Sequence, residues 1–206
     1  MLETFLAFDP AVLAAFVAAG LVLNFTPGVD FVFVSANGIA GGPRAGMAAA
    51  LGINLGVALH ILLAAAGLST LLLACPGAYD AIRYAGAAYL AYLAVQAWRS
   101  DTNLGKGTAL PPRTAIWRGF LTNILNPKVA LFVLAFIPQF TNPNYGPLWQ
   151  QMLILGAIFQ AFGLAFSMTL GATAGLFATA LKRRAGALNK ITSILFGGLA
   201  ARLIID

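Results

Sequence analysis

Thr26-Pro27-Gly28-Val29-Asp30 and Asn126-Pro127-Lys128 interrupt two long apolar stretches of this 206-residue chain near their middles. Each motif places a helix-capping residue directly before proline, which is the pattern of a helix start. In the hydrocarbon of a membrane, unpaired backbone groups and buried charges are both costly, so such breaks persist mainly where they line a protected cavity. The two motifs therefore predict a membrane transporter with a polar internal site.

The composition also places the chain in a membrane. Hydrophobic residues make up 60% of it and charged residues 9%, and the mean hydropathy is +0.87. A soluble domain of this size would have too little polar surface to cover itself. The net charge of +6 comes from basic residues between apolar runs, a distribution that argues against nucleic-acid binding. The single cysteine, Cys75, cannot form an internal disulfide, and we expect no metal and no cofactor.

Six apolar runs are long enough to cross a bilayer. They cover residues 11–35, 46–74, 81–98, 115–138, 148–180 and 188–205. We therefore expect an all-α membrane protein, with residues 1–206 forming a single transporter domain of six transmembrane helices. Its halves, about 1–100 and 113–206, are joined by a basic connection at about 99–118. Three helices in each half predict a 3+3 inverted repeat in which helices 1 and 4 are broken at proline.

The charges of the connections predict the orientation of the chain. The connection at about 99–118 and the segment 182–190 are rich in lysine and arginine, whereas the connection 141–147 carries no charge. Because basic connections stay in the cytoplasm, both termini are expected on the extracytoplasmic side.

The polar residues beside the two breaks form the candidate site. Each capped half-helix would present the positive end of its dipole, equivalent to about half an elementary charge, and would attract a carboxylate. Lys128 lies in the first turn after the break, so it needs an anionic partner, either Asp30 or a substrate carboxylate. Asp30 is also a candidate proton carrier. The candidate substrate-binding or coupling residues are Asn24, Thr26, Pro27, Gly28, Asp30, Asn123, Asn126, Pro127 and Lys128.

Several polar residues have structural alternatives. Asp30 and Lys128 could form a permanent pair that ties helix 1 to helix 4, or Lys128 could extend to the cytoplasmic face. His60 is a candidate proton relay because histidine changes charge near neutral pH, or it is a neutral hydrogen-bond partner between helices. Asn54 and Gln160 could likewise bond between helices or contact a substrate.

Several segments share a pattern with a known family. They are Asn24-Phe25-Thr26-Pro27-Gly28-Val29-Asp30-Phe31, the glycine-rich stretch from Asn37 through Gly56, Gly86-Ala87-Ala88-Tyr89-Leu90, Gly119 through Lys128, Leu131-Phe132 and Phe136-Ile137-Pro138-Gln139-Phe140. Over nearly the whole chain they resemble the LysE/RhtB family of amino-acid exporters. That family commonly has Thr-Pro-Gly-Pro at the first break, whereas this chain has Val29 in the last place, which should ease the kink. The resemblance implies efflux of amino acids or related metabolites from the bacterial cytoplasm across the plasma (inner) membrane, with proton antiport as the expected coupling.

We therefore expect a secondary active transporter and not an enzyme, whose partners are an amino acid, protons and membrane lipid. A passive channel for small solutes is an alternative because selectivity linings also use polar breaks in helices. An intramembrane hydrolase would need an activated nucleophile and base, and no spacing in the chain supports one. Glycine-lined faces permit either a homo-oligomer or internal packing. The sequence does not identify the amino acid.

Overall fold

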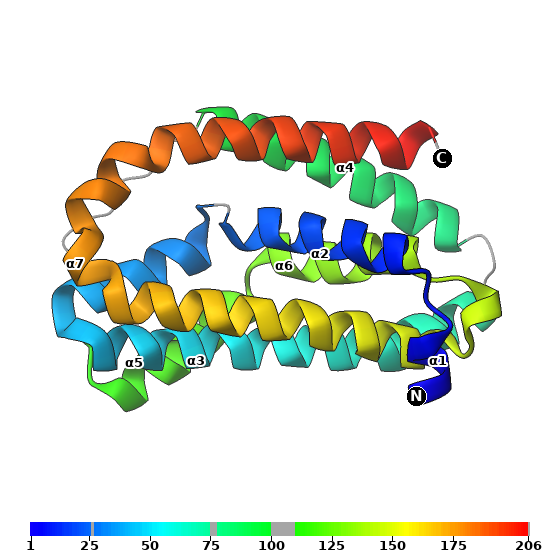
Figure 1. Cartoon of the computed structure of the whole chain (residues 1–206), viewed down its shortest axis with the longest axis horizontal. Helices are drawn as coiled ribbons and strands as arrows, with labels where there is room; N and C mark the ends of the chain where they lie inside the picture. Colours follow the sequence, from blue (N-terminus) through cyan, green and yellow to red (C-terminus); the bar gives the residue numbers. More distant parts are fainter. Residues whose placement is uncertain (26, 75–77, 100–109, 206) are drawn as a thin grey trace.

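The structure is a computed structural model that describes residues 1–25, 27–74, 78–99 and 110–205. Helices are the only regular elements in this part of the chain, which confirms the all-α prediction (Figure 1). The α-helices are α1 (Leu2–Leu6), α2 (Pro10–Phe25), α3 (Val29–Ala74), α4 (Ala78–Arg99), α5 (Pro112–Ile124), α6 (Pro127–Leu131) and α7 (Leu148–Ile205). A π-helical turn, η1 (Phe132–Phe136), and two 3-10 turns, η2 (Ile137–Phe140) and η3 (Pro143–Tyr145), connect α6 to α7. Most of the expected basic connection, residues 100–109, lies outside the described residues.

Helix α3 consists of two helical segments that meet at Gly42. This glycine has φ 73° and ψ −174°, a conformation that interrupts the helix and that side chains other than glycine rarely adopt. Pro43 follows directly and opens the second segment, where the missing proline N–H is not needed. The chain reverses its direction along the long axis of the molecule at this bend (Figure 1).

Helix α7 covers both of the last two predicted apolar runs. The sequence predicts a connection between residues 180 and 188, whereas the structure is helical without interruption from Leu148 to Ile205. The intervening segment contains alanine, leucine, lysine and arginine, which favour helix, together with one glycine, Gly186, and it lacks proline. The helix instead curves through this segment and returns along the molecule, so that both termini lie at the same end (Figure 1).

By length and composition, two helical segments of the described chain qualify as membrane spans. They are Val29–Gly67 and Leu148–Phe177, and the pair Pro112–Ile124 and Pro127–Phe140, bent by 53°, qualifies as a third if taken as one span. Helix α2 is apolar but shorter. The arrangement of six spans in an inverted repeat stays a prediction.

Glycines bring α3 close to α5 and α7. A Cβ atom on Gly46 of α3 would lie 2.7 Å from the Cα of Gly171 in α7, and one on Gly52 would lie 2.9 Å from the Cα of Ile116 in α5. Such contacts allow backbones in a membrane to approach more closely than side chains would permit. The packing fixes α3 between the two helices that carry much of the polar site.

Candidate functional site

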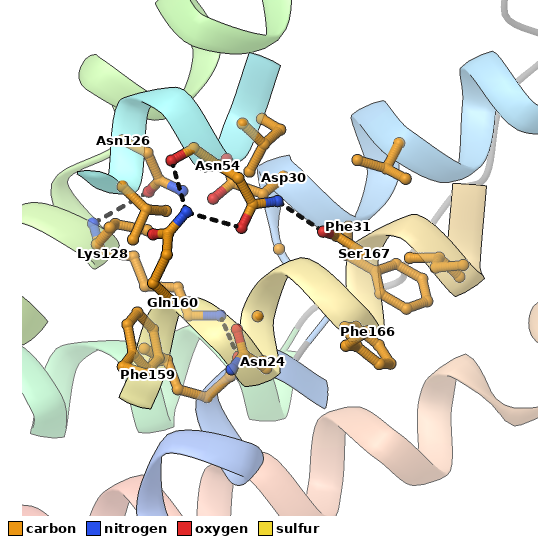
Figure 2. Close-up of a pocket in the computed structure, with 18 residues that line it drawn as sticks. Asn24, Asp30, Phe31, Asn54, Asn126, Lys128, Phe159, Gln160, Phe166 and Ser167 are labelled. Carbon is orange, nitrogen blue, oxygen red and sulfur yellow. Dashed lines mark hydrogen bonds between the residues drawn. The ribbon is translucent and has the colours of Figure 1, made fainter. Parts of the chain in front are cut away.

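A cavity of about 60 Å³ lies where α2, α3, α6 and α7 meet (Figure 2). Its volume is sufficient for several water molecules. The polar residues of the lining are Asn24, Asp30, Asn54, Asn126, Lys128, Gln160 and Ser167. The remainder of the lining is apolar except for backbone at two glycines: Leu23, Gly28, Phe31, Val34, Ile53, Val57, Val129, Phe159, Gly163, Phe166 and Leu170. The cavity therefore combines a polar region with an extensive apolar wall.

Asn126 and Pro127 form the start of α6 at the edge of the cavity. Helix α5 ends at Ile124, and α6 begins at Pro127. Asn126 has an extended backbone, and its Oδ1 accepts a hydrogen bond from the Lys128 N–H at 3.0 Å. This is the N-cap arrangement that the Asn-Pro pair predicts, and it directs the first turn of α6 toward the cavity.

The other predicted helix start lies between α2 and α3. Helix α2 ends at Phe25 and α3 begins at Val29, and the first α3 turn includes a bond from the Val32 N–H to the Gly28 carbonyl at 2.9 Å. Gly28 lines the cavity, whereas Pro27 and Pro127 do not. The capping role predicted for Thr26 falls on a residue outside the described ones.

Asn123 of α5 holds the carboxylate of Asp30. Its Nδ2 donates a hydrogen bond to Oδ2 of Asp30 at 2.7 Å, and the Asn123 residue is fully buried. The other carboxylate oxygen, Oδ1, is buried and has no hydrogen-bond partner within the described chain. Lys128 lines the same cavity as this carboxylate. A buried acceptor of this kind is suited to a proton or to an ammonium group.

Lys128 connects the two breaks. Its Nζ donates to the carbonyl oxygen of Leu23 at 3.4 Å, near the end of α2, and lies 5.7 Å from the ring centroid of Phe196. A cation is favoured at the C-terminal end of a helix, which compensates for the unfavourable position of Lys128 in the first turn of α6. The side chain lines the cavity, so the alternative in which it extends to the cytoplasmic face does not describe this structure (Figure 2).

His60 lies behind the cavity and does not line it. Its Nε2 is 3.3 Å from the carbonyl oxygen of Asn123, whose side chain in turn donates to Asp30. His60 therefore supports the residue that holds the carboxylate. This contact fits the alternative of a hydrogen-bond partner between helices, and the proton relay stays a prediction.

A second polar group joins α3 to α7 across the cavity. Gln160 Nε2 donates to the Asn54 carbonyl at 2.9 Å, and Asn54 Nδ2 donates to Ser167 Oγ at 2.7 Å (Figure 2). Asn54 Nδ2 also donates to the carbonyl oxygen of Ala50 at 2.8 Å. Oε1 of Gln160 and Nδ2 of Asn24 are buried without a hydrogen-bond partner among the residues described. These two groups add one acceptor and one donor to the polar region.

Comparison with known proteins identifies the family. The sequence model of the LysE type translocator family matches residues 21–206. The chain belongs to this family. Among its relatives, the leucine efflux protein of Salmonella typhimurium is 30% identical over 195 residues, which are 91% of this chain and 92% of the relative. An uncharacterized membrane protein of Vibrio cholerae is 33% identical over 151 residues, 72% of this chain and 73% of the relative. No solved structure gives a significant match.

Family membership confirms the resemblance found in the sequence and makes this LysE-type chain a transport protein of a bacterial membrane. The geometry adds Ser167 to the residues that the sequence singles out. A serine in an apolar helix belongs to no motif, and only its contact with Asn54 from another helix reveals its position. The spacing of Asn54 and Gln160, 106 residues apart, likewise gave no signal that they would meet.

Proposed function

We propose that this translocator is a secondary active transporter that exports an apolar amino acid from the bacterial cytoplasm by proton antiport. The observation that carries the proposal is the position of Asp30 in the same cavity as the capped start of α6 and Lys128, with one buried carboxylate oxygen that has no hydrogen-bond partner among the described residues. A zwitterionic ligand needs an anionic and a cationic contact, and these groups supply one of each.

The charged groups of an amino acid would occupy the polar region of the cavity. Its carboxylate would lie near the α6 N-terminus and Lys128, where the helix dipole and the ammonium both favour an anion. Its ammonium would lie near Oδ1 of Asp30, with Asn24 beside it. Asn123, which does not line the cavity, holds the Asp30 carboxylate in position, and the cap residue Asn126 contributes a contact from the lining.

The apolar wall supports a substrate with an apolar side chain. Phe159, Phe166 and Leu170 face the cavity from α7, opposite Val34 and Val57 of α3. Among the described lining residues Asp30 is the only acid, so the side-chain cation of a basic substrate would have no second carboxylate to pair with. The relative named as a leucine efflux protein has a substrate of this apolar class.

Competition at Asp30 would couple the proton to the amino acid. A protonated carboxyl has no charge to offer to an ammonium group, so binding of the amino acid favours release of the proton. Alternating exposure of the cavity to the two sides would then exchange one for the other. The residues that line a passive channel would not need this competition.

We also propose six spans for residues 1–206, in halves of about 1–100 and 113–206, with both termini outside the cytoplasm. The supporting observations are the interruption between α2 and α3, the bend between α5 and α6 at the same cavity, and the two termini at one end of the molecule (Figure 1). In this arrangement each half opens with a broken helix, as in an inverted repeat.

Transport by purified protein in proteoliposomes tests the proposed function. Vesicles that are acidic inside should accumulate radiolabelled leucine above its external concentration, because protons leave as leucine enters, and a protonophore should abolish the accumulation. Lysine should not accumulate. Leucine that only equilibrates across the membrane, with or without the gradient, would favour the channel and contradict the antiporter.

A further inference from the structure

A second hollow lies on the outer surface of the protein, away from the transport cavity. Helices α3 and α5 enclose an apolar groove of about 730 Å³, and no residue of the transport cavity lines it. Leu55, Leu59 and Leu62 line it from α3, and Arg113, Trp117 and Phe120 line it from α5. Leu55, Leu62 and Trp117 are each about half exposed. In a membrane protein an exposed apolar surface of this kind faces lipid.

The groove is polar at one end only. Helices α3 and α5 run in the same direction, since Gly52 packs on Ile116 and Gly56, one turn later, packs on Asn123. Arg113 lies in the first turn of α5, and the apolar residues follow along both helices. The segment from Leu55 to Leu62, seven helical steps, extends over about 10 Å of helix. The groove therefore suits an amphipathic ligand with one anionic end.

We infer that this groove binds an anionic phospholipid of the surrounding bilayer. Its phosphate contacts the Arg113 guanidinium, and one acyl chain lies along Leu59, Leu62 and Phe120. Arginine donates to phosphate in a bidentate geometry, and tryptophan is common at the membrane interface, where Trp117 would lie one turn deeper than Arg113. Among the described residues no side chain caps the N-terminus of α5, so the positive end of this helix adds to the attraction for phosphate.

A second copy of the chain is a poorer match for the groove than a lipid. The acidic residues with described side chains are Glu3, Asp9 and Asp30. Glu3 and Asp9 belong to the end of the molecule opposite to the start of α5, and Asp30 lines the transport cavity (Figure 1). A copy inserted in the same orientation would bring none of these carboxylates to Arg113. The inference rests on membrane insertion and not on the transport proposal.

Quenching of tryptophan fluorescence by lipids with brominated acyl chains tests the inference. In a Trp98→Phe, Trp149→Phe background, Trp117 is the remaining tryptophan and reports contact in the groove. Brominated phosphatidylglycerol should bind beside Trp117 about fivefold more strongly than brominated phosphatidylcholine, the ratio expected for one basic residue at the membrane surface. Arg113→Gln should remove the preference.

Arg118→Gln is the matched control, because it removes the same charge from an exposed position of α5 that does not line the groove. This variant should retain the preference for phosphatidylglycerol. Equal quenching of Trp117 by the two lipids in the background that retains Arg113 would overturn the inference. An unchanged preference for phosphatidylglycerol in Arg113→Gln would also overturn it. Trp117 that neither lipid quenches, in a protein that sediments as a dimer, would overturn it in favour of a second copy.

Discussion

Substitution of Gly56 by alanine should disturb the site through a single contact. A Cβ atom at Gly56 would lie 2.6 Å from Oδ1, 2.8 Å from Cβ and 3.0 Å from Cγ of Asn123. To reach ordinary contact at 3.4 Å, Asn123 must move by roughly 0.6 to 0.8 Å, and its burial leaves it little space. A shift of that size away from Asp30 would stretch the 2.7 Å hydrogen bond to the limit of such interactions.

The expected magnitude follows from that bond. A hydrogen bond to a charged group contributes about 1.5–3 kcal/mol, so its loss should lower the initial rate of gradient-driven leucine transport by roughly 10- to 100-fold. The extra methyl group should also lower the free energy of unfolding by about 1–3 kcal/mol. Both quantities are measurable, the first in proteoliposomes and the second by thermal unfolding in detergent.

Two companion variants make the result specific. Gly67→Ala adds the same methyl group to α3 at a position where no described atom outside its own helix lies within 4 Å of the added carbon, so transport and stability should match the wild type. Asn123→Ala should reduce transport as Gly56→Ala does, and the double variant should be no worse than Asn123→Ala alone, because the methyl acts through Asn123. A Gly56→Ala protein that is stable and transports at the wild-type rate would refute the reasoning.

Three further predictions concern the charged residues and the helix packing. Asp30→Asn should abolish proton-driven accumulation of leucine, and an unchanged rate and pH dependence would contradict the role of Asp30 in coupling. Wild-type protein should bind leucine at least about 10-fold more tightly than leucinamide, since a hydrogen bond to a charged group contributes about 1.5–3 kcal/mol. Lys128→Gln should remove most of that difference in affinity. Equal binding of the two ligands by the wild type would contradict the proposed contact with the carboxylate. Gly171→Ala should lower the free energy of unfolding by about 1–3 kcal/mol, because its Cβ would meet the Gly46–Met47 backbone. The added Cβ of Gly175→Ala makes only ordinary contact, so this variant should be as stable as the wild type. Equal thermal stability of the two variants would argue against this packing.

Local chemistry made the residues around the breaks predictable from the sequence. Asn126 before Pro127 is a capping pattern, and it predicts both the start of α6 and the hydrogen bond to the Lys128 N–H. The proximity of Asp30 and Lys128 was also expected, since two breaks in corresponding positions of the chain suggested a shared site. These inferences needed only the residues next to each proline.

Contacts that depend on the packing of distant helices were not predictable. Asn123 stood out only because it adjoins a break, and its bond to Asp30 depends on how Gly56 lets α5 approach α3. Ser167 carried no signal at all. The helix through residues 181–187 also differs from the prediction, because most residues of this segment favour helix and only Gly186 does not, so its composition does not distinguish a helical bend from a connection.

The most direct measurement is protection of a single cysteine in the cavity by the substrate. In a Cys75→Ser background, Ser167→Cys places a thiol in the cavity lining, and Ser193→Cys places one in α7 beside α4, outside the cavity. Saturating leucine should slow the reaction of a small thiol reagent with the Ser167→Cys variant. The rate of reaction with the Ser193→Cys variant should not change. Equal rates with and without leucine at both positions, in protein that still transports leucine, would show that the substrate site lies elsewhere.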